Sequence, residues 1–390
     1  MNSTESTHKP LLKRTSIRLL LLLIVILAVM AGVFRGEAPT IRSSGETMKA
    51  IVYHEYGAPE VLSYENTDRP LPNDDQVLIQ VIAASANPYD WHFMRGTPYL
   101  MRLMGSGLLK PVDKRVGVDV AGEIAAIGKD VTEFNVGDRV YGVATGSFAE
   151  YALAYPRHIA EIPANISPEQ AASIAIAGLT ALQGLRDVGE LKDGQTVLIN
   201  GASGGVGTFA VQIAKAMGAE VTGVSSGRNH ELVRSLGADH MIDYTKENFT
   251  EGTKKFDLIL DNVANHSLSA LRSALSSNGK LVLVGGGGPH DGLWIGPLIN
   301  PIKALIYSPF IDQKMVTMMG SLNAKDLRAL NRLMEEGKMT PMIDRTYALE
   351  DAAEAIRYLE TGRARAKVIV KVANGNSRKL TGLDRQSHIK

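Results

Sequence analysis

The most informative part of the chain reads Val197-Leu198-Ile199-Asn200-Gly201-Ala202-Ser203-Gly204-Gly205-Val206-Gly207. An apolar run leads into a glycine-rich turn, and a pattern with helical spacing follows. Glycines let a backbone turn tightly and approach a ligand closely, and the start of a helix offers free N–H groups to an anion. This stretch therefore predicts a site for the pyrophosphate of a dinucleotide, the alternative being a purely structural turn.

Strands and helices alternate around this turn. Strands are predicted at Thr196–Asn200, Glu220–Ser225, His240–Asp243, Phe256–Asn262 and Lys280–Gly285, with helices at Gly205–Met217, Asn229–Leu236 and His266–Leu275. Continuous apolar strands joined by helices are typical of a parallel sheet covered on both faces. The sequence therefore predicts an α/β fold with a doubly wound parallel sheet over residues 167–321.

The flanking residues have a different pattern. Residues 48–166 hold short β-like runs separated by Gly, Pro, Asp and Asn, which indicates an all-β or barrel-like domain. Ser167 and Pro168 suit the N-cap and first position of a helix that opens the next domain. Residues 322–373 again alternate between helix and strand, and we expect them to return to the first domain. A polar tail is predicted at 374–390.

Composition excludes several kinds of site. The 390 residues carry 42 Lys and Arg against 41 Asp and Glu, so near-neutral charge gives no reason to expect a nucleic-acid partner. Apolar residues make up 45% of the chain, which excludes a largely disordered protein. Cysteine is absent, which excludes disulfides, thiolate catalysis and cysteine-ligated zinc.

The choice between NAD and NADP is made where the second strand of the parallel sheet ends. An acidic residue about 20 residues after the glycine turn would hold the ribose 2′-hydroxyl of NAD. The chain has Ser225, Ser226 and Arg228 there instead, and these suit a 2′-phosphate. The sequence therefore predicts NADP(H), although Arg228 could simply be solvated. Tyr244 could close over the adenine side or only pack.

The N-terminus looks like a separate piece of chain. Residues Leu19–Phe34 form a run of sixteen without a charge, preceded by a basic flank. A spanning helix needs about 20 apolar residues, so this run is short. We expect residues 1–47 to form an uncleaved single-pass membrane anchor and a linker, with a cleaved signal peptide or a second start at Met48 as alternatives. The side of the membrane stays open, because the charge rule and the cytosolic supply of NADPH point in opposite directions.

Met48–Val372 resembles the zinc-independent, quinone-oxidoreductase branch of the medium-chain dehydrogenase/reductase superfamily. The matching segments are Met48-Lys49-Ala50, Asn87-Pro88-Tyr89-Asp90-Trp91, Gly117-Val118-Asp119-Val120-Ala121-Gly122, Gly137-Asp138-Arg139-Val140, Gly178-Leu179-Thr180-Ala181, Gly201–Gly207 and Gly237-Ala238-Asp239. The resemblance implies a GroES-like β-barrel catalytic domain built from both ends of this region, a Rossmann domain between them, an active site in the cleft and a possible homodimer.

The resemblance also bears on metal binding. Zinc-dependent members carry a catalytic Cys near Asn87 and a Gly-His-Glu near Gly117, whereas this chain has Asn87, Val118 and Asp119 at the corresponding places. The cysteine-rich lobe that holds structural zinc is missing as well. We therefore predict no metal site.

Without a metal, the chemistry expected is hydride transfer from NADPH to a small lipophilic quinone or α,β-unsaturated carbonyl. Asn87, Asp90 and His92 are the catalytic candidates. Asp90 could equally cap the next helix, and His92 stands where related enzymes have a Tyr, so a proton-donating role is possible for it.

Further cofactor contacts are expected at the nicotinamide end. They are assigned to Thr180, to Asn262 and Val263, and to Gly285, Gly286 and Gly287, which end later strands at the ligand crevice. The glycine run could also be no more than a loop. Two other functions stay open: alcohol–carbonyl interconversion, and a catalytically weak NADPH-binding protein with a structural or regulatory role.

Overall fold

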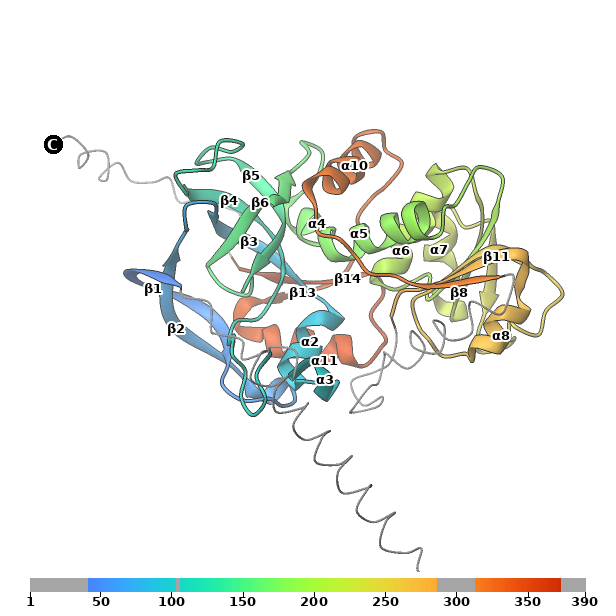
Figure 1. Ribbon diagram of the computed structural model, residues 1–390, viewed down its shortest axis with the longest axis horizontal. Helices are drawn as coiled ribbons and strands as arrows, with labels where there is room; N and C mark the ends of the chain where they lie inside the picture. The colour runs from blue at the N-terminus through green and yellow to red at the C-terminus, as the bar shows by residue number, and fades with distance from the viewer. Residues whose placement is uncertain (1–40, 103–105, 286–312, 373–390) are drawn as a thin grey trace, which may run out of the picture.

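The computed structural model describes residues 41–102, 106–285 and 313–372. Two sheet-based halves lie side by side, with α4, α5 and β14 between them (Figure 1). The predicted N-terminal helix, Gly286, Gly287 and the tail at 374–390 lie outside the described residues.

The half on the right of Figure 1 is a parallel sheet with strand order β12-β11-β10-β7-β8-β9. Its strands are β7 (Thr196–Asn200), β8 (Glu220–Ser225), β9 (His240–Asp243), β10 (Phe256–Asp261), β11 (Leu275–Leu283) and β12 (Lys314–Thr317). The helices associated with it are α5 (Ala175–Gln183), α6 (Gly205–Ala216), α7 (His230–Ser235) and α8 (Leu268–Ser273). The predicted Rossmann sheet is confirmed, although β11 begins five residues before the predicted Lys280.

Most apolar residues of these strands are buried, as expected for a sheet that is covered on both faces. Val197, Leu198 and Ile199 of β7 are all 0% exposed, as a strand covered on both faces requires. Phe209 of α6 is equally buried and packs in the same core. The sheet is therefore the rigid platform on which the glycine turn stands.

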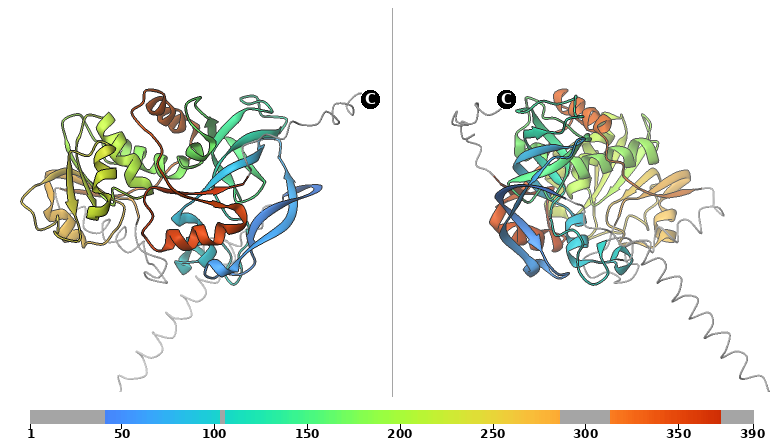
Figure 2. Two further views of the ribbon diagram at one scale, coloured as in Figure 1. Left: turned by 180° about the vertical axis from the view of Figure 1, so that it is seen from behind. Right: turned by 60° about the vertical axis from the view of Figure 1, so that its left-hand side comes forward.

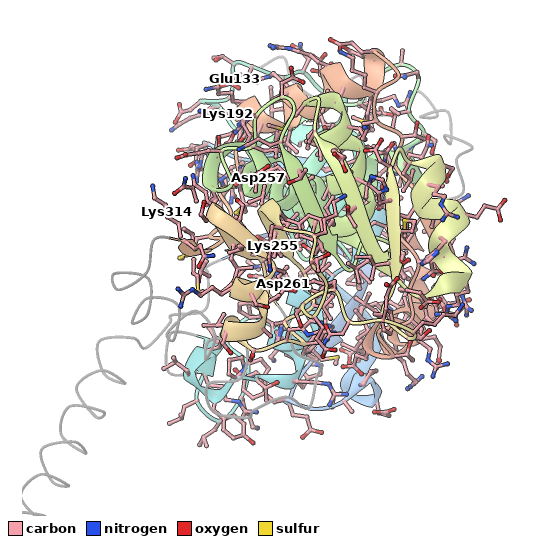
Figure 3. All side chains as sticks on the ribbon, turned by 90° about the vertical axis from the view of Figure 1, so that its right-hand side faces the viewer. Glu133, Lys192, Lys255, Asp257, Asp261 and Lys314 are labelled. Atoms are coloured by element: carbon pink, nitrogen blue, oxygen red, sulfur yellow. The ribbon has the colours of Figure 1, made fainter. Side chains whose placement is uncertain are left out.

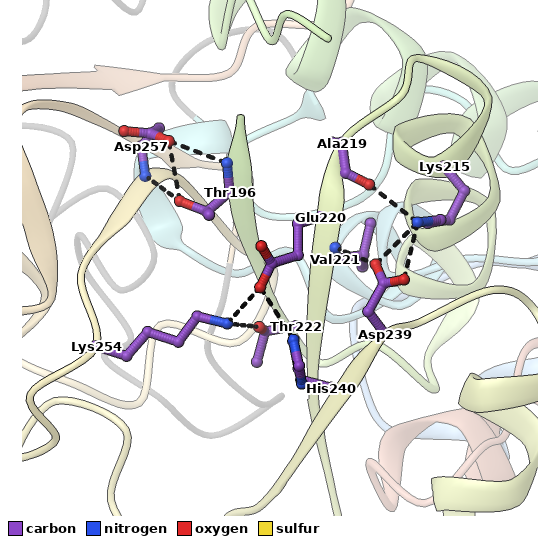
Figure 4. Close-up of polar contacts among 10 residues, drawn as sticks. All are labelled: Thr196, Lys215, Ala219, Glu220, Val221, Thr222, Asp239, His240, Lys254 and Asp257. Atoms are coloured by element: carbon purple, nitrogen blue, oxygen red, sulfur yellow. Dashed lines mark hydrogen bonds and ion pairs between the residues drawn. The ribbon is translucent and has the colours of Figure 1, made fainter. Parts of the chain in front are cut away.

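Polar contacts join the amino ends of the parallel strands (Figure 4). Thr196, the first residue of β7, donates to Asp257 Oδ2 through both its N–H and its hydroxyl at 3.0 Å. Glu220, the first residue of β8, pairs with Lys254 at 2.8 Å. Asp257 stands near the start of β10 and Asp261 ends it, and Figure 3 labels both residues. The amino ends are thus tied together, which leaves the carboxyl ends for a ligand.

The other half of Figure 1 is a barrel-like sheet of order β13-β14-β3-β4-β5-β6, closed by an additional pairing of β3 with β6. Its strands are β3 (Val77–Ala86), β4 (Asp119–Ile127), β5 (Arg139–Thr145), β6 (Tyr151–Glu161), β13 (Ile343–Ala348) and β14 (Lys367–Lys371). β14 pairs antiparallel with β3, so the last described strand returns to the sheet that the first part of the chain began.

The helices of this half fix its edges. They are α2 (Pro88–Arg95), α3 (Tyr99–Met101), α4 (Pro168–Ala172), α10 (Ala324–Glu335) and α11 (Ala352–Glu360). The short elements of this half are η1 (Pro59–Val61) and η7 (Leu349–Asp351), whereas η3 (Gly184–Val188) and η4 (Gly227–Asn229) belong to the parallel-sheet half. Ser167 caps α4 by accepting from the Gln170 N–H at 3.2 Å. Arg95 of α2 holds Glu360 of α11 through two bonds of 2.5 and 2.8 Å, and Figure 2 shows these helices together.

The first described strand begins earlier than the sequence predicts. β1 (Arg42–Tyr53) pairs with β2 (Leu62–Leu71) as an antiparallel ribbon, and Thr47 lies opposite Asp68. Residues 42–47 are therefore strand and not linker. They are mostly exposed, so the ribbon needs no apolar pattern there, and the prediction from hydrophobicity missed it.

The predicted membrane location has to be corrected. Within the described ranges, no helix is long and apolar enough to cross a bilayer. The run Leu19–Phe34 that motivated the prediction lies outside the described residues. The membrane anchor and the membrane partner are accordingly withdrawn.

Candidate active site

The glycine turn forms a cradle at the carboxyl end of β7. Gly201 has φ +78°, in the left-handed region that favours glycine. A Cβ on Gly207 would lie 2.1 Å from the Gly201 carbonyl oxygen, so only glycine lets α6 come this close to the turn. Gly204, the N-cap of α6, offers no capping side chain, and the first N–H groups of the helix remain free for an anion. The predicted pyrophosphate cradle thus has the expected backbone.

A buried network holds the neighbouring strand end. Asn200 Nδ2 donates to Asp261 Oδ1 at 2.9 Å, and Asp261 is 0% exposed. The same oxygen accepts from the Val263 N–H at 3.1 Å, and Asn262 Nδ2 donates to the Asn200 carbonyl at 2.9 Å. Asn262 and Val263 are therefore fixed beside the turn, where a Cβ on Gly201 would lie 2.8 Å from Val263 Cγ2. The residue pattern alone did not identify Asn200 and Asp261 as the groups that position them.

The end of β8 is joined to the same turn. Ser225 is buried, Ser226 half-buried and Arg228 exposed. Asn229 Nδ2 donates to Ser203 Oγ at 3.0 Å, which ties the segment after β8 to the glycine turn. Nothing in the residue pattern singled out Asn229, because its partner is 26 residues away.

An acid that the sequence pattern did not single out lies close by. Asp243 ends β9, and its Oδ2 would be 2.6 Å from a Cβ on Gly227. Its other oxygen accepts from the Thr245 hydroxyl at 2.7 Å and the Thr245 N–H at 3.1 Å, and these bonds lower the pKa of Asp243. Asp243 is thus charged and tied to its own loop. Tyr244, which follows it, is 58% exposed.

Two further cofactor candidates sit on other elements. Thr180 of α5 donates its hydroxyl to the Ile176 carbonyl at 2.7 Å, so that hydroxyl keeps only its acceptor capacity. Gly285 follows β11 and is exposed, with no atom within 4 Å of a Cβ placed on it. Both positions leave room for a ligand but show no cradle of their own.

A buried polar cluster lies where the two halves meet. Lys367 Nζ, at the start of β14, donates to Asn87 Oδ1 at 2.6 Å and lies 3.2 Å from Asp119 Oδ2. Asp119 also accepts from Asn87 Nδ2 at 3.0 Å and from Ser85 Oγ at 2.8 Å. The side chains of Lys367 and Asp119 are 4% and 0% exposed, so this ion pair is held out of water.

The cluster is in direct contact with the cofactor cradle. The Ala366 N–H, next to Lys367, donates to the Ser203 carbonyl at 2.8 Å, and Ala366 bridges to Gly204. On the other side, the Ile176 N–H at the start of the parallel-sheet half donates to Asp119 Oδ1 at 2.9 Å. Lys367 was not among the predicted site residues, although a lone Lys at the start of an apolar strand was a usable signal.

The three predicted catalytic residues have different surroundings. The amide of Asn87 is fully engaged, because its Nδ2 also donates to the Ser85 carbonyl at 3.1 Å. His92 Nδ1 lies 2.8 Å from the Thr97 carbonyl, and burial lowers the pKa of His92. Asp90 Oδ2 accepts from the Asn87 N–H at 2.8 Å, which is the capping role that the sequence offered as the alternative. Asp90 is nevertheless the one of the three that lines the cavity described next.

The cavity has a volume of about 700 Å³, within the usual range of roughly 300–1,000 Å³ for small-molecule sites. Its wall is mostly apolar and aromatic, and it includes Tyr53, Phe93 and Val118 from the barrel half. Leu322, from the segment after β12, also lines it. An apolar cavity with a few polar groups suits a lipophilic substrate.

Metal-ligand chemistry is limited in the part of the chain that the structure describes. No group of three or more His, Cys, Asp or Glu side chains is arranged there to hold a metal ion. Where a zinc-type Cys and His would stand, Asn87 binds Lys367, and Val118 lines the cavity. Metal independence stays a prediction.

Known proteins match this chain over most of its length. The alcohol dehydrogenase GroES-like domain matches residues 73–164, and the zinc-binding dehydrogenase family matches residues 236–370. The quinone oxidoreductase of Sus scrofa is 35% identical over 321 residues, covering 79% of this chain and 92% of that protein. The 2-methylene-furan-3-one reductase of Solanum lycopersicum is 33% identical over 353 residues, covering 86% and 81%.

A solved structure agrees with the fold as well. The quinone oxidoreductase from Coxiella burnetii superposes with a TM-score of 0.74 at 32% identity, covering 84% of this chain and all of that one. This chain thus combines the glycine turn, the barrel and the returning strand β14 with more than 30% sequence identity to quinone oxidoreductases. The chain therefore belongs to the zinc-independent, quinone-oxidoreductase-like family of medium-chain dehydrogenases/reductases, and it is an oxidoreductase that uses NAD(P)H.

Proposed function

We propose that the protein transfers a hydride from NADPH to a quinone or an α,β-unsaturated carbonyl compound without zinc. One observation carries this proposal: the start of β14 contacts both the glycine turn and the buried polar cluster beside the cavity. Ala366 binds the glycine turn at Ser203, while the adjacent Lys367 binds Asn87 and Asp119 beside the cavity. Cofactor and substrate would thus be held by one rigid junction.

The cradle residues fit a dinucleotide. Gly201, Gly204 and Gly207 let the backbone approach a pyrophosphate, and the start of α6 offers it N–H groups and a positive dipole end. Asn262 and Val263 are fixed at the neighbouring strand end, and Thr180 and Gly285 remain proposals for the nicotinamide side. When bound, the nicotinamide supplies the hydride.

NADP is proposed over NAD from the residues around the end of β8. Ser225, Ser226 and Arg228 offer hydroxyls and a guanidinium to a 2′-phosphate. Asp243 is the acid that would favour NAD, but its carboxylate is held by Thr245. Tyr244 is exposed beside this place and is proposed to cover the adenosine end.

The cavity supports the substrate class. Its wall is largely apolar, which lowers the local dielectric constant and strengthens interactions with charge that develops on a carbonyl oxygen. The Sus scrofa and Solanum lycopersicum relatives are by name a quinone oxidoreductase and a furanone reductase, which supports the same class. The junction at Lys367 fixes the barrel half, which lines the cavity, against the glycine turn that would hold the cofactor.

The domain division and the oligomeric state belong to the proposal too. We assign the barrel half to residues 42–166 and 322–372 and the dinucleotide-binding half to 167–321, with a homodimer by analogy to the family. The proposed function is tested with NADPH deuterated at C4, a quinone and an enone, followed by mass spectrometry of the products. Deuterium in the reduced enone supports the proposal, and NADPH oxidation without reduced product contradicts it.

A further inference from the structure

We propose that the carboxyl group of Asp90 is the acid that donates the proton completing the reduction. This inference rests on the proposed function and adds the group that would serve it. Hydride transfer to a quinone or an enone develops negative charge on the substrate oxygen, and a proton must neutralise that charge. The inference is carried by the position of Asp90 and by the charges around it.

Asp90 is placed between the substrate cavity and the buried cluster. It is the third residue of α2, is 4% exposed and forms part of the cavity wall. Its carboxyl group accepts from the backbone N–H groups of Asn87 and Gly117. Those two bonds fix the orientation of the carboxyl group, and neither supplies a counter-charge.

The buried cluster holds two carboxyl groups and one ammonium group. Lys367 Nζ lies 3.2 Å from Asp119 Oδ2, so its positive charge is paired with that carboxylate. A second buried carboxylate would be uncompensated, and such a charge is strongly disfavoured. The structure thus provides a reason for Asp90 to keep its proton.

The pKa of Asp90 depends on the charged and polar groups that surround it. Burial raises the pKa of Asp90 to about 7; the charge of Asp119 adds to the rise, and Lys367 and the two backbone N–H groups oppose it. Tyr53 and Asp113 face the same region, and the carboxyl of Asp90 raises the pKa of Tyr53 further above the effect of burial. A carboxyl group tuned close to neutral pH is suited to general acid catalysis.

The other titratable side chains of the cavity fit this role less well. Burial raises the pKa of Tyr53 and of Tyr89, so both are weaker acids than usual. Burial and the nearby Arg157 lower the pKa of His158, which favours its neutral form. His92, predicted from the sequence, is directed to the Thr97 carbonyl.

The step balances in atoms and charge. The hydride brings its electron pair to the electrophilic atom of the enone or quinone, where that pair becomes the new bond to hydrogen. The π electron pair that this displaces moves through the conjugated system onto the substrate oxygen. The O–H bond of Asp90 breaks in the same step, as its proton passes to the oxygen on which negative charge develops, leaving a carboxylate on Asp90. Asp90 then regains a proton from water at the open side of the cavity. One NADPH and one proton are consumed for each substrate reduced.

The experiment compares Asp90→Asn with the wild type in single-turnover NADPH oxidation between pH 5 and 9. The amide of the variant keeps an oxygen that can accept from the Asn87 N–H, so the helix cap survives. In the wild type the rate should fall as the pH rises through about 7, because Asp90 loses its proton. The variant should be at least about 100-fold slower, and its rate should no longer fall as the pH rises through about 7. Its affinity for NADPH should stay within about twofold of the wild type.

A matched control separates chemistry from capping. Gln170 makes the same reach back to a helix N-cap, at Ser167, away from the cavity, so Gln170→Ala should leave the rate and its pH dependence unchanged. A wild type that reduces quinone or enone while Asp90→Asn matches it in rate and pH profile overturns the role of Asp90 and leaves the proposed function standing. A wild type that reduces neither overturns the proposed function itself.

An infrared difference titration gives a readout independent of turnover. A protonated buried carboxyl group should be visible in the wild type at pH 6, disappear by pH 8.5 and be absent from Asp90→Asn at both. Asp119→Asn removes the carboxylate that disfavours ionisation of Asp90, so the midpoint should move to lower pH. No protonated carboxyl signal at pH 6 in the wild type would overturn the inference.

Discussion

Lys367 Nζ lies 2.6 Å from Asn87 Oδ1, although 280 residues separate the two in the chain. Asn87 precedes α2 at the end of β3, and Lys367 begins β14, the neighbouring strand. The pairing of β14 with β3 therefore assembles the polar junction, which also contacts the glycine turn through Ala366. The fold thus joins two distant segments of the chain at the site itself.

Removing Lys367 should destabilise the protein strongly. Lys367→Met leaves the fully buried Asp119 without its cation, so we expect a loss of about 3–5 kcal/mol in the free energy of unfolding, measured by denaturant titration. Lys129 pairs with Asp74 on the surface, so Lys129→Met should change stability by less than about 0.5 kcal/mol. Similar effects of the two substitutions would show that the junction is not an essential buried pair.

The glycine turn should not tolerate a side chain at Gly207. Gly207→Ala places a Cβ 2.1 Å from the Gly201 carbonyl oxygen, so the turn must distort and NADPH binding should be lost, as measured by fluorescence titration. In Gly252→Ala the nearest atom to the new Cβ is the Phe249 carbonyl oxygen at 3.6 Å, and binding should be unchanged. Normal NADPH affinity in Gly207→Ala would argue against the cradle.

Arg228 should distinguish the two cofactors. Arg228→Ala is expected to weaken NADPH binding about ten- to hundredfold while changing NADH binding little, because only NADPH carries the 2′-phosphate. Arg234 on α7 is also exposed, and Arg234→Ala serves as the charge-matched control. An equal loss for both cofactors would remove the argument for NADP.

Local sequence encodes some parts of this site and not others. The turn from Gly201 to Gly207 and the apolar strand at 196–200 were predictable, because strand, turn and helix are specified within a short window. The Lys367–Asn87–Asp119 cluster was not, because the partners meet only after β14 has paired with β3. The start of β1 at Arg42 was missed for another reason: an exposed ribbon leaves no hydrophobic period.

Asp90 should also make the free energy of unfolding depend on pH. The folded protein holds the proton of Asp90 up to about pH 7, whereas an unfolded Asp releases it near pH 3.9. Between these values the folded state binds more protons, so stability should fall as pH rises, by up to about 1.4 kcal/mol per pH unit from this group. The contribution is fully present below about pH 4 and lost above about pH 7.

Urea titrations of the wild type and Asp90→Asn between pH 4 and 8 isolate this contribution. The variant lacks the titrating group, so its stability relative to the wild type should rise with pH across that range. Parallel curves for the two proteins would contradict a raised pKa at Asp90.

The central claim is that NADPH reduces a quinone or an enone here without a metal. Its most direct test is steady-state NADPH oxidation with a quinone, on purified enzyme dialysed against a strong chelator and analysed for metal content. We predict undiminished turnover with no stoichiometric zinc, because Asn87 and Lys367 occupy the junction where a zinc-dependent enzyme would need ligands. Turnover that is lost on chelation and restored by one zinc per chain would contradict the account.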